Sequence, residues 1–351
     1  MTPGPTEVPP PVREAMSRPV ENPYVQEEFS EFYHSLEDKL QELYGTEDDV
    51  IILGGEGILG LEASIASLIE KGDKVLCISN GIFGDGFADF VESYGGEPVV
   101  CDFQPDKPLN IKKIKEVVEQ HDFKLATMVH CETPTGMLNP IEKVLEILKE
   151  EDMITVVDAV SSLGGTPIPM EDVDICIGGS QKCLSSPPGL TALSVSEDAW
   201  EIIMEKEDHH FYTSLKGWKE DWLEQGRFPY TPSVSNLYAL DESVDSILRE
   251  GKEYVYIRHE EISSQCRERG KQIGLEFFPE TEKLCSPTVT AFKVDGEADR
   301  IQKEVREKHD ILLATGFGDL KEDIIRVGHM GYNAEESKVK RTMDALEDVI
   351  G

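Results

Sequence analysis

The chain has 351 residues, of which 39% are hydrophobic, 34 are lysine or arginine and 69 are aspartate or glutamate. The resulting net charge of −35 would repel nucleic-acid backbones and anionic membranes, so nucleic-acid binding is not expected. No run of about 18 apolar residues is present to span a bilayer, and no basic leader or apolar signal segment opens the chain, so we expect a cytoplasmic protein with no membrane partner.

The first residues are expected to form an arm, and the rest of the chain two domains. Residues 1–20 are rich in proline and are predicted to be extended. The chain exceeds the length at which single hydrophobic cores usually stop growing. We therefore expect an N-terminal arm at 1–20, a large domain at 21–250 and a small domain at 251–351.

The large domain has the alternating pattern of an α/β fold. After a helix at Glu27–Tyr44, short β-rich runs alternate with amphipathic segments of helical length. This alternation is typical of β-α-β units around a mostly parallel sheet. The expected strands of this seven-stranded sheet are Val50–Leu53, Lys74–Ser79, Pro98–Cys101, Leu125–His130, Ile154–Asp158, Asp174–Ile177 and Leu190–Val195. The expected helices are Leu59–Lys71, Phe83–Tyr94, Ile111–Gln120, Ile141–Glu150 and Leu237–Glu250.

The C-terminal part is predicted to be a smaller α+β domain. Its expected strands are Thr288–Val294 and Asp323–Val327, and its expected helices are Ala298–Lys308 and Glu335–Val349. No internal repeat interrupts this pattern.

A glycine-rich loop, Gly54-Gly55-Glu56-Gly57-Ile58-Leu59-Gly60, joins the first expected strand to the next helix. Its glycines would let backbone amides approach an anion at the positive end of that helix. The loop also matches the dinucleotide fingerprint, but that fingerprint expects an acidic residue after the second strand, where this chain has Ser79-Asn80-Gly81. The loop favours phosphate binding, with a nicotinamide site and a purely structural turn as alternatives.

Lys182 and Asp158 form the most informative pair in the chain. Asp158 closes the apolar run Met153–Val157, and Lys182 follows the next expected strand through Gly178-Gly179-Ser180-Gln181. An amine and a carboxylate at neighbouring strand ends suit a carbonyl cofactor with a basic ring nitrogen, because the carboxylate keeps that nitrogen protonated while the amine forms an imine and moves a proton. The pair predicts pyridoxal 5′-phosphate as the cofactor.

Cysteine and histidine placement argues against a metal centre. The seven cysteines are odd in number and scattered, with no C-x-x-C pair, which also disfavours a disulfide framework. His130 ends a buried strand and is expected to be a satisfied core residue, and His209-His210 lack partners at metal-ligand spacing. No metal is expected.

The motifs together resemble the class V aminotransferases of the fold-type I pyridoxal-phosphate enzymes, especially the alanine–glyoxylate and serine–pyruvate aminotransferases. The resemblance covers essentially the whole chain. The blocks that carry it are Thr2-Pro3-Gly4-Pro5-Thr6, Leu61-Glu62-Ala63, Asn80-Gly81-Ile82-Phe83-Gly84, Glu132-Thr133-Pro134-Thr135-Gly136, Asp158-Ala159-Val160-Ser161-Ser162-Leu163-Gly164-Gly165, Gly179-Ser180-Gln181-Lys182, Pro187-Pro188-Gly189 and Arg326-Val327-Gly328.

The resemblance implies roles for individual residues. It makes Lys182 the Schiff-base lysine and Asp158 the partner of the ring nitrogen. It implies cofactor contacts for Phe83 on the ring face, Thr133 at the 3-hydroxyl side, Val160 under the ring, and Gln181, Gly57 and Ile58 at the phosphate. It further implies that Arg326 binds the substrate carboxylate, that Gly4 contacts substrate, and that Thr231 reaches the phosphate of a neighbouring subunit in a homodimer with shared sites.

Three positions depart from the family pattern. Glu56 stands where relatives usually carry serine at the phosphate, Phe228 stands where many have tyrosine, and Asn22-Pro23-Tyr24 lacks a familiar His-Arg pair. A carboxylate beside a phosphate costs energy unless it points away, is protonated or is paired. We therefore expect Glu56 to turn outward or to meet a cation or the substrate.

The sequence thus predicts transamination between a small amino acid, alanine or serine, and a 2-oxo acid, glyoxylate or pyruvate. Alternatives within the family are an aminophosphonate or ureidoglycine transaminase and a cysteine desulfurase. A desulfurase would need a nucleophilic thiol on a late mobile loop, and the only late candidate, Cys285, stands at the start of an expected strand. A nicotinamide-dependent dehydrogenase is the alternative from another class.

Overall fold

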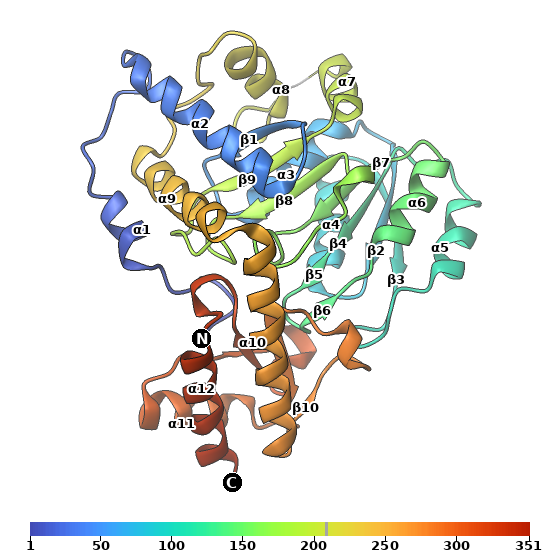
Figure 1. Ribbon diagram of the computed structural model, residues 1–351. Coiled ribbons are helices and arrows are strands. Elements are labelled where there is room, and N and C mark those ends of the chain that lie inside the picture. The colour runs from blue at the N-terminus through green and yellow to red at the C-terminus, as the bar shows by residue number, and fades with distance from the viewer. Residues whose placement is uncertain (208–209) are drawn as a thin grey trace.

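The structure of the chain is a computed structural model that describes residues 1–207 and 210–351 (Figure 1). His209, one of the two adjacent histidines considered above, lies outside the described residues. A large sheet domain and a smaller C-terminal domain are joined by the long helix α10, Lys252–Gln272, as Figure 1 shows.

The large domain is built on one seven-stranded sheet with the order β1-β9-β8-β7-β4-β2-β3. Its strands are β1 (Asp49–Leu53), β2 (Lys74–Ser79), β3 (Glu97–Asp102), β4 (Leu125–Val129), β7 (Ile154–Asp158), β8 (Ile175–Gly179) and β9 (Thr191–Val195). Pairing is parallel from β3 to β8, whereas β9 runs antiparallel to both of its neighbours. The expected α/β class and the seven-stranded, mostly parallel sheet are confirmed.

Helices pack on this sheet through their apolar sides. The helices of the large domain are α1 (Pro10–Ala15), α2 (Glu27–Tyr44), α3 (Gly57–Leu68), α4 (Ile82–Ser93), α5 (Ile111–Val118), α6 (Glu142–Glu150), α7 (Glu197–Glu205), α8 (Leu215–Gly217) and α9 (Val234–Glu250). Contacts join α3 to β8 and β9, α4 to β2 and β3, and α6 to β7. A short hairpin of β5 (Cys131–Glu132) and β6 (Met137–Leu138) extends the chain beyond β4.

The small domain carries its own four-stranded antiparallel sheet, in the order β10-β11-β13-β12. The strands are β10 (Glu276–Phe277), β11 (Val289–Lys293), β12 (Ala314–Thr315) and β13 (Ile324–Gly328), and the helices that follow α10 are α11 (Ala298–His309) and α12 (Glu336–Ile350). A separate cluster of buried apolar side chains, drawn from residues 262–349, forms its core.

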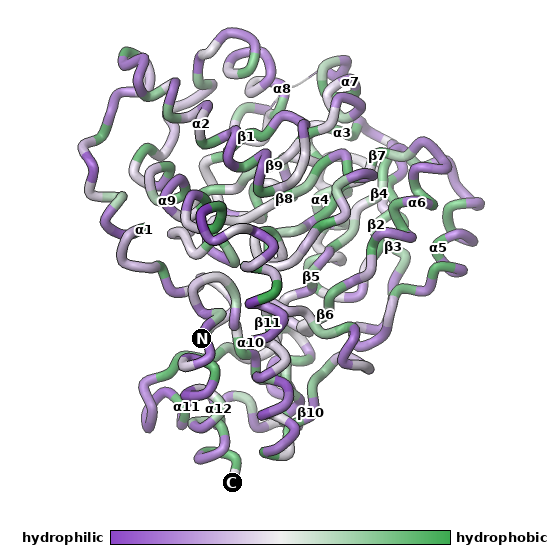
Figure 2. Tube along the Cα trace, in the orientation of Figure 1, coloured by the Kyte–Doolittle hydropathy of each residue, from purple (hydrophilic) through white to green (hydrophobic). Residues whose placement is uncertain are grey.

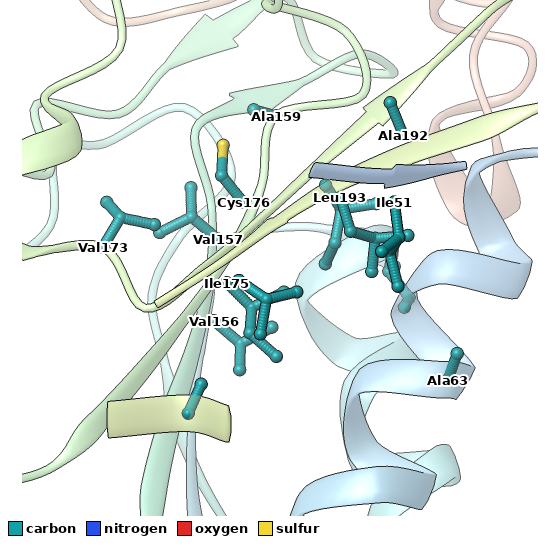
Figure 3. Close-up of a cluster of buried hydrophobic side chains, with 14 of the residues drawn as sticks. Ile51, Ala63, Val156, Val157, Ala159, Val173, Ile175, Cys176, Ala192 and Leu193 are labelled. Atoms are coloured by element: carbon teal, nitrogen blue, oxygen red, sulfur yellow. The ribbon is translucent and has the colours of Figure 1, made fainter. Parts of the chain in front are cut away.

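The centre of the large sheet is buried on both faces. Every residue of β4, β7 and β8 is buried, as expected for parallel strands covered by helices on each side. Figure 2 shows the hydrophobic stretches gathered along these strands, with hydrophilic stretches on the outer helices. Figure 3 shows Val156 and Ile175 packed together beneath the strands, with Leu193 and Ile51 beside them. This rigid centre holds the strand ends on which the candidate site is built.

The N-terminal arm is not extended throughout, which corrects the sequence-based expectation. Residues Pro10–Ala15 form α1, with a proline at the helix start, where its fixed φ favours a helix and its missing N–H costs nothing. Val12 is buried, and α1 packs against α9. The backbone of the arm is hydrogen-bonded to both domains, because Met1 accepts from Gly328 and Thr6 donates to Gln181. The arm therefore links the small domain to the large one.

Within residues 1–207 and 210–351, none of the helices combines the length and the apolar character needed to cross a bilayer.

Candidate active site

Lys182 lies in the turn after β8 and reaches back toward the N-terminal arm. Its Nζ donates a hydrogen bond of 2.8 Å to the carbonyl oxygen of Pro3. Burial lowers the pKa of this lysine, and the nearby positive charge of Arg326 lowers it further, against the opposing effect of Asp158. A lowered pKa leaves more of the amine neutral, which is the form that attacks a carbonyl or accepts a proton.

Asp158 is the last residue of β7, the strand paired directly with β8. Its Oδ1 accepts a hydrogen bond of 2.8 Å from the backbone N–H of Val160, which fixes the carboxyl group at the strand end. Burial raises the pKa of Asp158 to about 6, although the Val160 amide and the charge of Lys182 act in the opposite direction. The negative charge of Glu56 adds to the increase. A buried carboxyl group of this kind is ready to pair with a cation.

A cavity of about 280 Å³ brings the predicted residues together. Eight of the residues singled out from the sequence line it: Gly4, Gly57, Ile58, Phe83, Asp158, Val160, Gln181 and Lys182. The rest of the lining is Pro5, Glu56, Leu61, Ser161 and Pro188. The cavity is therefore lined by the arm, the start of α3, the start of α4 and the turns after β7 and β8.

The first turn of α3 forms one end of the cavity. Gly57 is required there, because a Cβ at this position would lie 2.7 Å from Cγ2 of Val160. The close approach places the N–H groups of Gly57 and Ile58 at the positive end of a 12-residue helix, which is an anion-binding arrangement. Glu56 immediately precedes this turn, and its Oε2 accepts a hydrogen bond of 3.2 Å from Nε2 of Gln181. Its partner is thus a neutral amide that lines the same cavity, and Glu56 itself is exposed to solvent. No cation meets it among the described residues, and its expected contact with the substrate stays a prediction.

Comparisons with known proteins agree with this geometry. The family model described as aminotransferase class V matches residues 2–330. The chain belongs to this family. It is 38% identical to an uncharacterized aminotransferase of Methanocaldococcus jannaschii, over 99% of this chain and 91% of that protein. It is 31% identical to the pyridoxamine–pyruvate transaminase of Mesorhizobium japonicum, over 99% of this chain and 90% of that protein. The solved structure of an alanine–glyoxylate aminotransferase from a Nostoc species matches with a TM-score of 0.96 and 28% identity. The match covers 100% of this chain and 94% of that chain.

The class V aminotransferases are pyridoxal-phosphate-dependent enzymes, and this chain is an aminotransferase of that kind. The lining fits the ring and the aldehyde of the cofactor, since Phe83 and Val160 are apolar surfaces and Lys182 and Asp158 supply the amine and the carboxylate. Gln181 adds a side-chain oxygen, Oε1, that is buried and has no hydrogen-bond partner among the described residues. A buried polar atom without a partner is costly, so a bound molecule is the natural partner.

Three sequence-predicted residues do not line the cavity. Thr133 is buried and its hydroxyl is hydrogen-bonded to Oγ of Ser161, which does line it. Arg326 lies on β13, where its Nε donates 2.7 Å to the carbonyl oxygen of Thr315. Burial lowers the pKa of Arg326 to about 10, so it remains a cation at neutral pH. Thr231 is exposed and shares a hydrogen bond of 2.9 Å with the hydroxyl of Tyr24.

Glu132 is a residue of the site region to which the sequence assigned no role. It is fully buried on β5, and its Oε1 accepts a hydrogen bond of 3.3 Å from the backbone N–H of Phe83. Its Oε2 has no hydrogen-bond partner in the part of the chain that the structure describes. Burial, with a contribution from the charge of Asp158, raises its pKa to about 8. The signal in the sequence was a glutamate two residues after the expected strand Leu125–His130, at the start of the block Glu132-Thr133-Pro134-Thr135-Gly136.

Two of the alternatives considered from the sequence, the nicotinamide-dependent dehydrogenase and the cysteine desulfurase, lose their basis. The glycine loop belongs to a class V aminotransferase, so its match to the dinucleotide fingerprint is coincidental. Burial raises the pKa of the Cys285 thiol to about 12, which leaves almost no thiolate at neutral pH. A desulfurase nucleophile at this position is therefore not supported. His130 is confirmed as a satisfied core residue, because it is buried and its Nδ1 lies 2.9 Å from Oγ of Ser162.

Proposed function

We propose that the protein transfers an amino group between a small amino acid, such as alanine or serine, and a 2-oxo acid, such as glyoxylate or pyruvate. The similarity to an alanine–glyoxylate aminotransferase and to a pyridoxamine–pyruvate transaminase supports both oxo acids as acceptors. The observation that carries the proposal is the placement of Lys182 and Asp158 at adjacent strand ends of one cavity. No other lysine or arginine of the described residues lines that cavity.

Each of these side chains has a defined task. Bound pyridoxal phosphate supplies an electron sink for the bond between the substrate Cα and its hydrogen. Lys182, whose pKa is lowered, provides a neutral amine that would take the proton from the substrate Cα and deliver it to the aldehyde carbon of the bound cofactor. Asp158, held by the Val160 amide, keeps the ring nitrogen protonated. Arg326 binds the substrate carboxylate through the two parallel N–H groups of its guanidinium.

The proposal includes a homodimer with shared sites. Thr231 is exposed and lies outside the cavity of its own chain, which supports a contact with the phosphate in the site of a second subunit. We also propose that each subunit is organised as an N-terminal arm at 1–20, a large domain at 21–250 and a small domain at 251–351. A cytoplasmic location is supported by seven cysteines that are all free and buried, because reduced thiols suit a reducing compartment.

The test is spectroscopic first and kinetic second. Purified protein is mixed with pyridoxal phosphate, and we expect a visible absorbance band that disappears on adding alanine or serine and returns on adding glyoxylate or pyruvate. Lys182→Ala should lose both the band and turnover. Lys112→Ala, at an exposed position on α5, is the matched control and should retain both. A Lys182→Ala protein with near-normal rates, or a wild-type protein that stays colourless, would refute the proposal.

A further inference from the structure

The phosphate end of the cavity already contains a negative charge of the protein. Glu56 stands directly before the first turn of α3, where the N–H groups of Gly57 and Ile58 would receive an anion. The residue lines the cavity at a position exposed to solvent, and its carboxylate accepts from the amide of Gln181. A phosphate ester at this place would therefore meet a like charge at short range.

The one buried polar side-chain atom of the cavity lining that has no hydrogen-bond partner among the described residues is an acceptor. Oε1 of Gln181 is buried without a partner among the described residues, and the orientation of the amide is fixed because its Nε2 donates to Glu56. The carboxylate of Glu56, which already accepts from Gln181, is an acceptor as well. A phosphate dianion carries only acceptors and can donate to neither group, whereas a hydroxyl group can donate its O–H to one of them.

The charges of the residues that line the cavity also disfavour a phosphate at this end. Lys182 is the only basic side chain of the described residues that lines the cavity, and its amine is required at the aldehyde carbon, at the other end of the ligand. Glu56 and Asp158 are the lining acids, and the charge of Glu56 already raises the pKa of Asp158. In the lining formed by one described chain, nothing positive other than the α3 N-terminus offsets a phosphate against Glu56.

We propose that Glu56 adapts this end of the site to a free hydroxymethyl group, so that the enzyme takes unphosphorylated pyridoxamine as an amino-group donor and releases pyridoxal. This further activity rests on the proposed function, because it uses the same Lys182, Asp158 and ring contacts. The hydroxymethyl O–H of pyridoxamine donates to the carboxylate of Glu56. A phosphate ester cannot make this charge-assisted hydrogen bond.

The exchange balances without any further reactant. Pyridoxamine and a 2-oxo acid become pyridoxal and an amino acid. The C–N bond at the aminomethyl carbon breaks and a C–N bond forms at the oxo carbon. The aminomethyl carbon is oxidised by two electrons and the oxo carbon is reduced by two. Lys182 moves the proton from the first carbon to the second, and the water lost when the amine condenses with the oxo acid is regained when pyridoxal is released.

The decisive experiment compares two ligands that differ only in the phosphate. Equilibrium absorbance titrations with pyridoxal and with pyridoxal phosphate give the ratio of their dissociation constants, a readout independent of turnover. We compare wild type with Glu56→Ser, which removes size and charge, and Glu56→Gln, which removes charge at nearly constant size. Glu142→Gln, at an exposed position at the start of α6, is the matched control for net charge.

We expect wild type to bind pyridoxal at least as tightly as pyridoxal phosphate, and to form pyridoxal from pyridoxamine and pyruvate. Glu56→Ser should shift the ratio toward pyridoxal phosphate by about tenfold or more, since one like charge near the phosphate is removed. Glu56→Gln should shift it in the same direction by less, and Glu142→Gln should not shift it.

Two other results would overturn the inference. One is a wild-type protein that binds pyridoxal phosphate more than about tenfold tighter than pyridoxal. The other is a ratio that neither Glu56 variant moves. Both leave the proposed function standing, because the absorbance band still forms with the phosphorylated cofactor. Absence of a band with both pyridoxal and pyridoxal phosphate would instead refute the proposed function itself. The wild-type ratio decides the matter even where the serine variant fails to fold.

Discussion

Gly4 lies against the side chain of Lys182 so closely that a Cβ on Gly4 would be 2.5 Å from Cδ and 2.7 Å from Nζ of the lysine. The backbone of Gly4 has a φ of +109°, a conformation that L residues rarely adopt. The adjacent Pro3 accepts the hydrogen bond from the same Nζ. The arm therefore positions the amine on which the proposed chemistry depends.

Replacing Gly4 with alanine should impair the site through both effects. The methyl group displaces the lysine, and the backbone strain costs on the order of 1–3 kcal/mol. We expect cofactor affinity and kcat to fall by roughly ten- to a hundredfold. The matched control is Gly72→Ala, because Gly72 has a φ of +92° and a Cβ added there would meet no described atom within 4 Å. That variant should lose stability but keep its cofactor affinity; equal loss of affinity in both variants would contradict the role of the Gly4 contact.

Periodicity and turn chemistry were sufficient to predict most of the fold. All seven strands of the large sheet were placed within one or two residues, because each is an apolar run bounded by glycine or a charged turn, and Glu27–Tyr44 was placed without error. The helix Pro10–Ala15 was missed, since its two prolines signal an extended chain and its stability comes from packing on α9. That contact joins segments far apart in sequence, which local patterns do not contain.

The candidate site also contains residues that local sequence patterns predict and residues whose contacts depend on the fold. Lys182 and Asp158 could be predicted because they lie at the ends of two successive apolar strands, which commonly pair in a parallel sheet. The partner of Glu56 could not, because Gln181 approaches it only after β1 and β8 take their places on either side of β9. Glu132 belongs to one of the family motifs, but its burial against Phe83 depends on how β5 packs beside α4.

Replacing Asp158 with asparagine should slow the chemistry while the fold is retained. Asparagine keeps an oxygen that accepts from the Val160 N–H, so local structure is preserved. It cannot keep the ring nitrogen protonated, and we expect kcat to fall by about a hundredfold or more while an absorbance band still forms. In wild type, ring binding should weaken as the pH falls through about 6, where Asp158 becomes protonated. The variant should lack this pH dependence; an unchanged profile would contradict the pairing, and Asp122→Asn, at an exposed position, serves as the control.

Replacing Arg326 with lysine should weaken binding of the substrate carboxylate. The guanidinium is fixed by its Nε hydrogen bond to Thr315 and lies 4.8 Å from the ring centroid of Phe317, which leaves its two terminal nitrogens for a carboxylate. Lysine keeps the charge but not the paired donors. We expect KM for the 2-oxo acid to rise by roughly ten- to a hundredfold, with a smaller effect on kcat. Arg300→Lys, in an exposed ion pair on α11, should leave KM unchanged. An unaltered KM in Arg326→Lys would place the carboxylate elsewhere.

Replacing Glu132 with glutamine should change how stability depends on pH. Burial raises the pKa of Glu132 to about 8 in the folded protein, well above its ordinary value of 4.5. Below the ordinary value the carboxyl group is protonated in both states, and its contribution to stability is fully present. As the pH rises toward 8, the unfolded chain releases the proton while the folded protein retains it, so stability is lost. Glutamine resembles the protonated form and keeps an acceptor for the Phe83 N–H.

The measurement is chemical denaturation of the cofactor-free protein at about pH 5 and about pH 8. Wild type should lose more stability than Glu132→Gln between these values, by on the order of a few kcal/mol. Glu142→Gln, at an exposed position on α6, is the control and should follow wild type. Parallel behaviour of wild type and Glu132→Gln would mean that Glu132 is ionised at neutral pH. In that case the pocket beside Phe83 would hold a second negative charge close to Asp158, and the pKa of Asp158 would respond to the substitution.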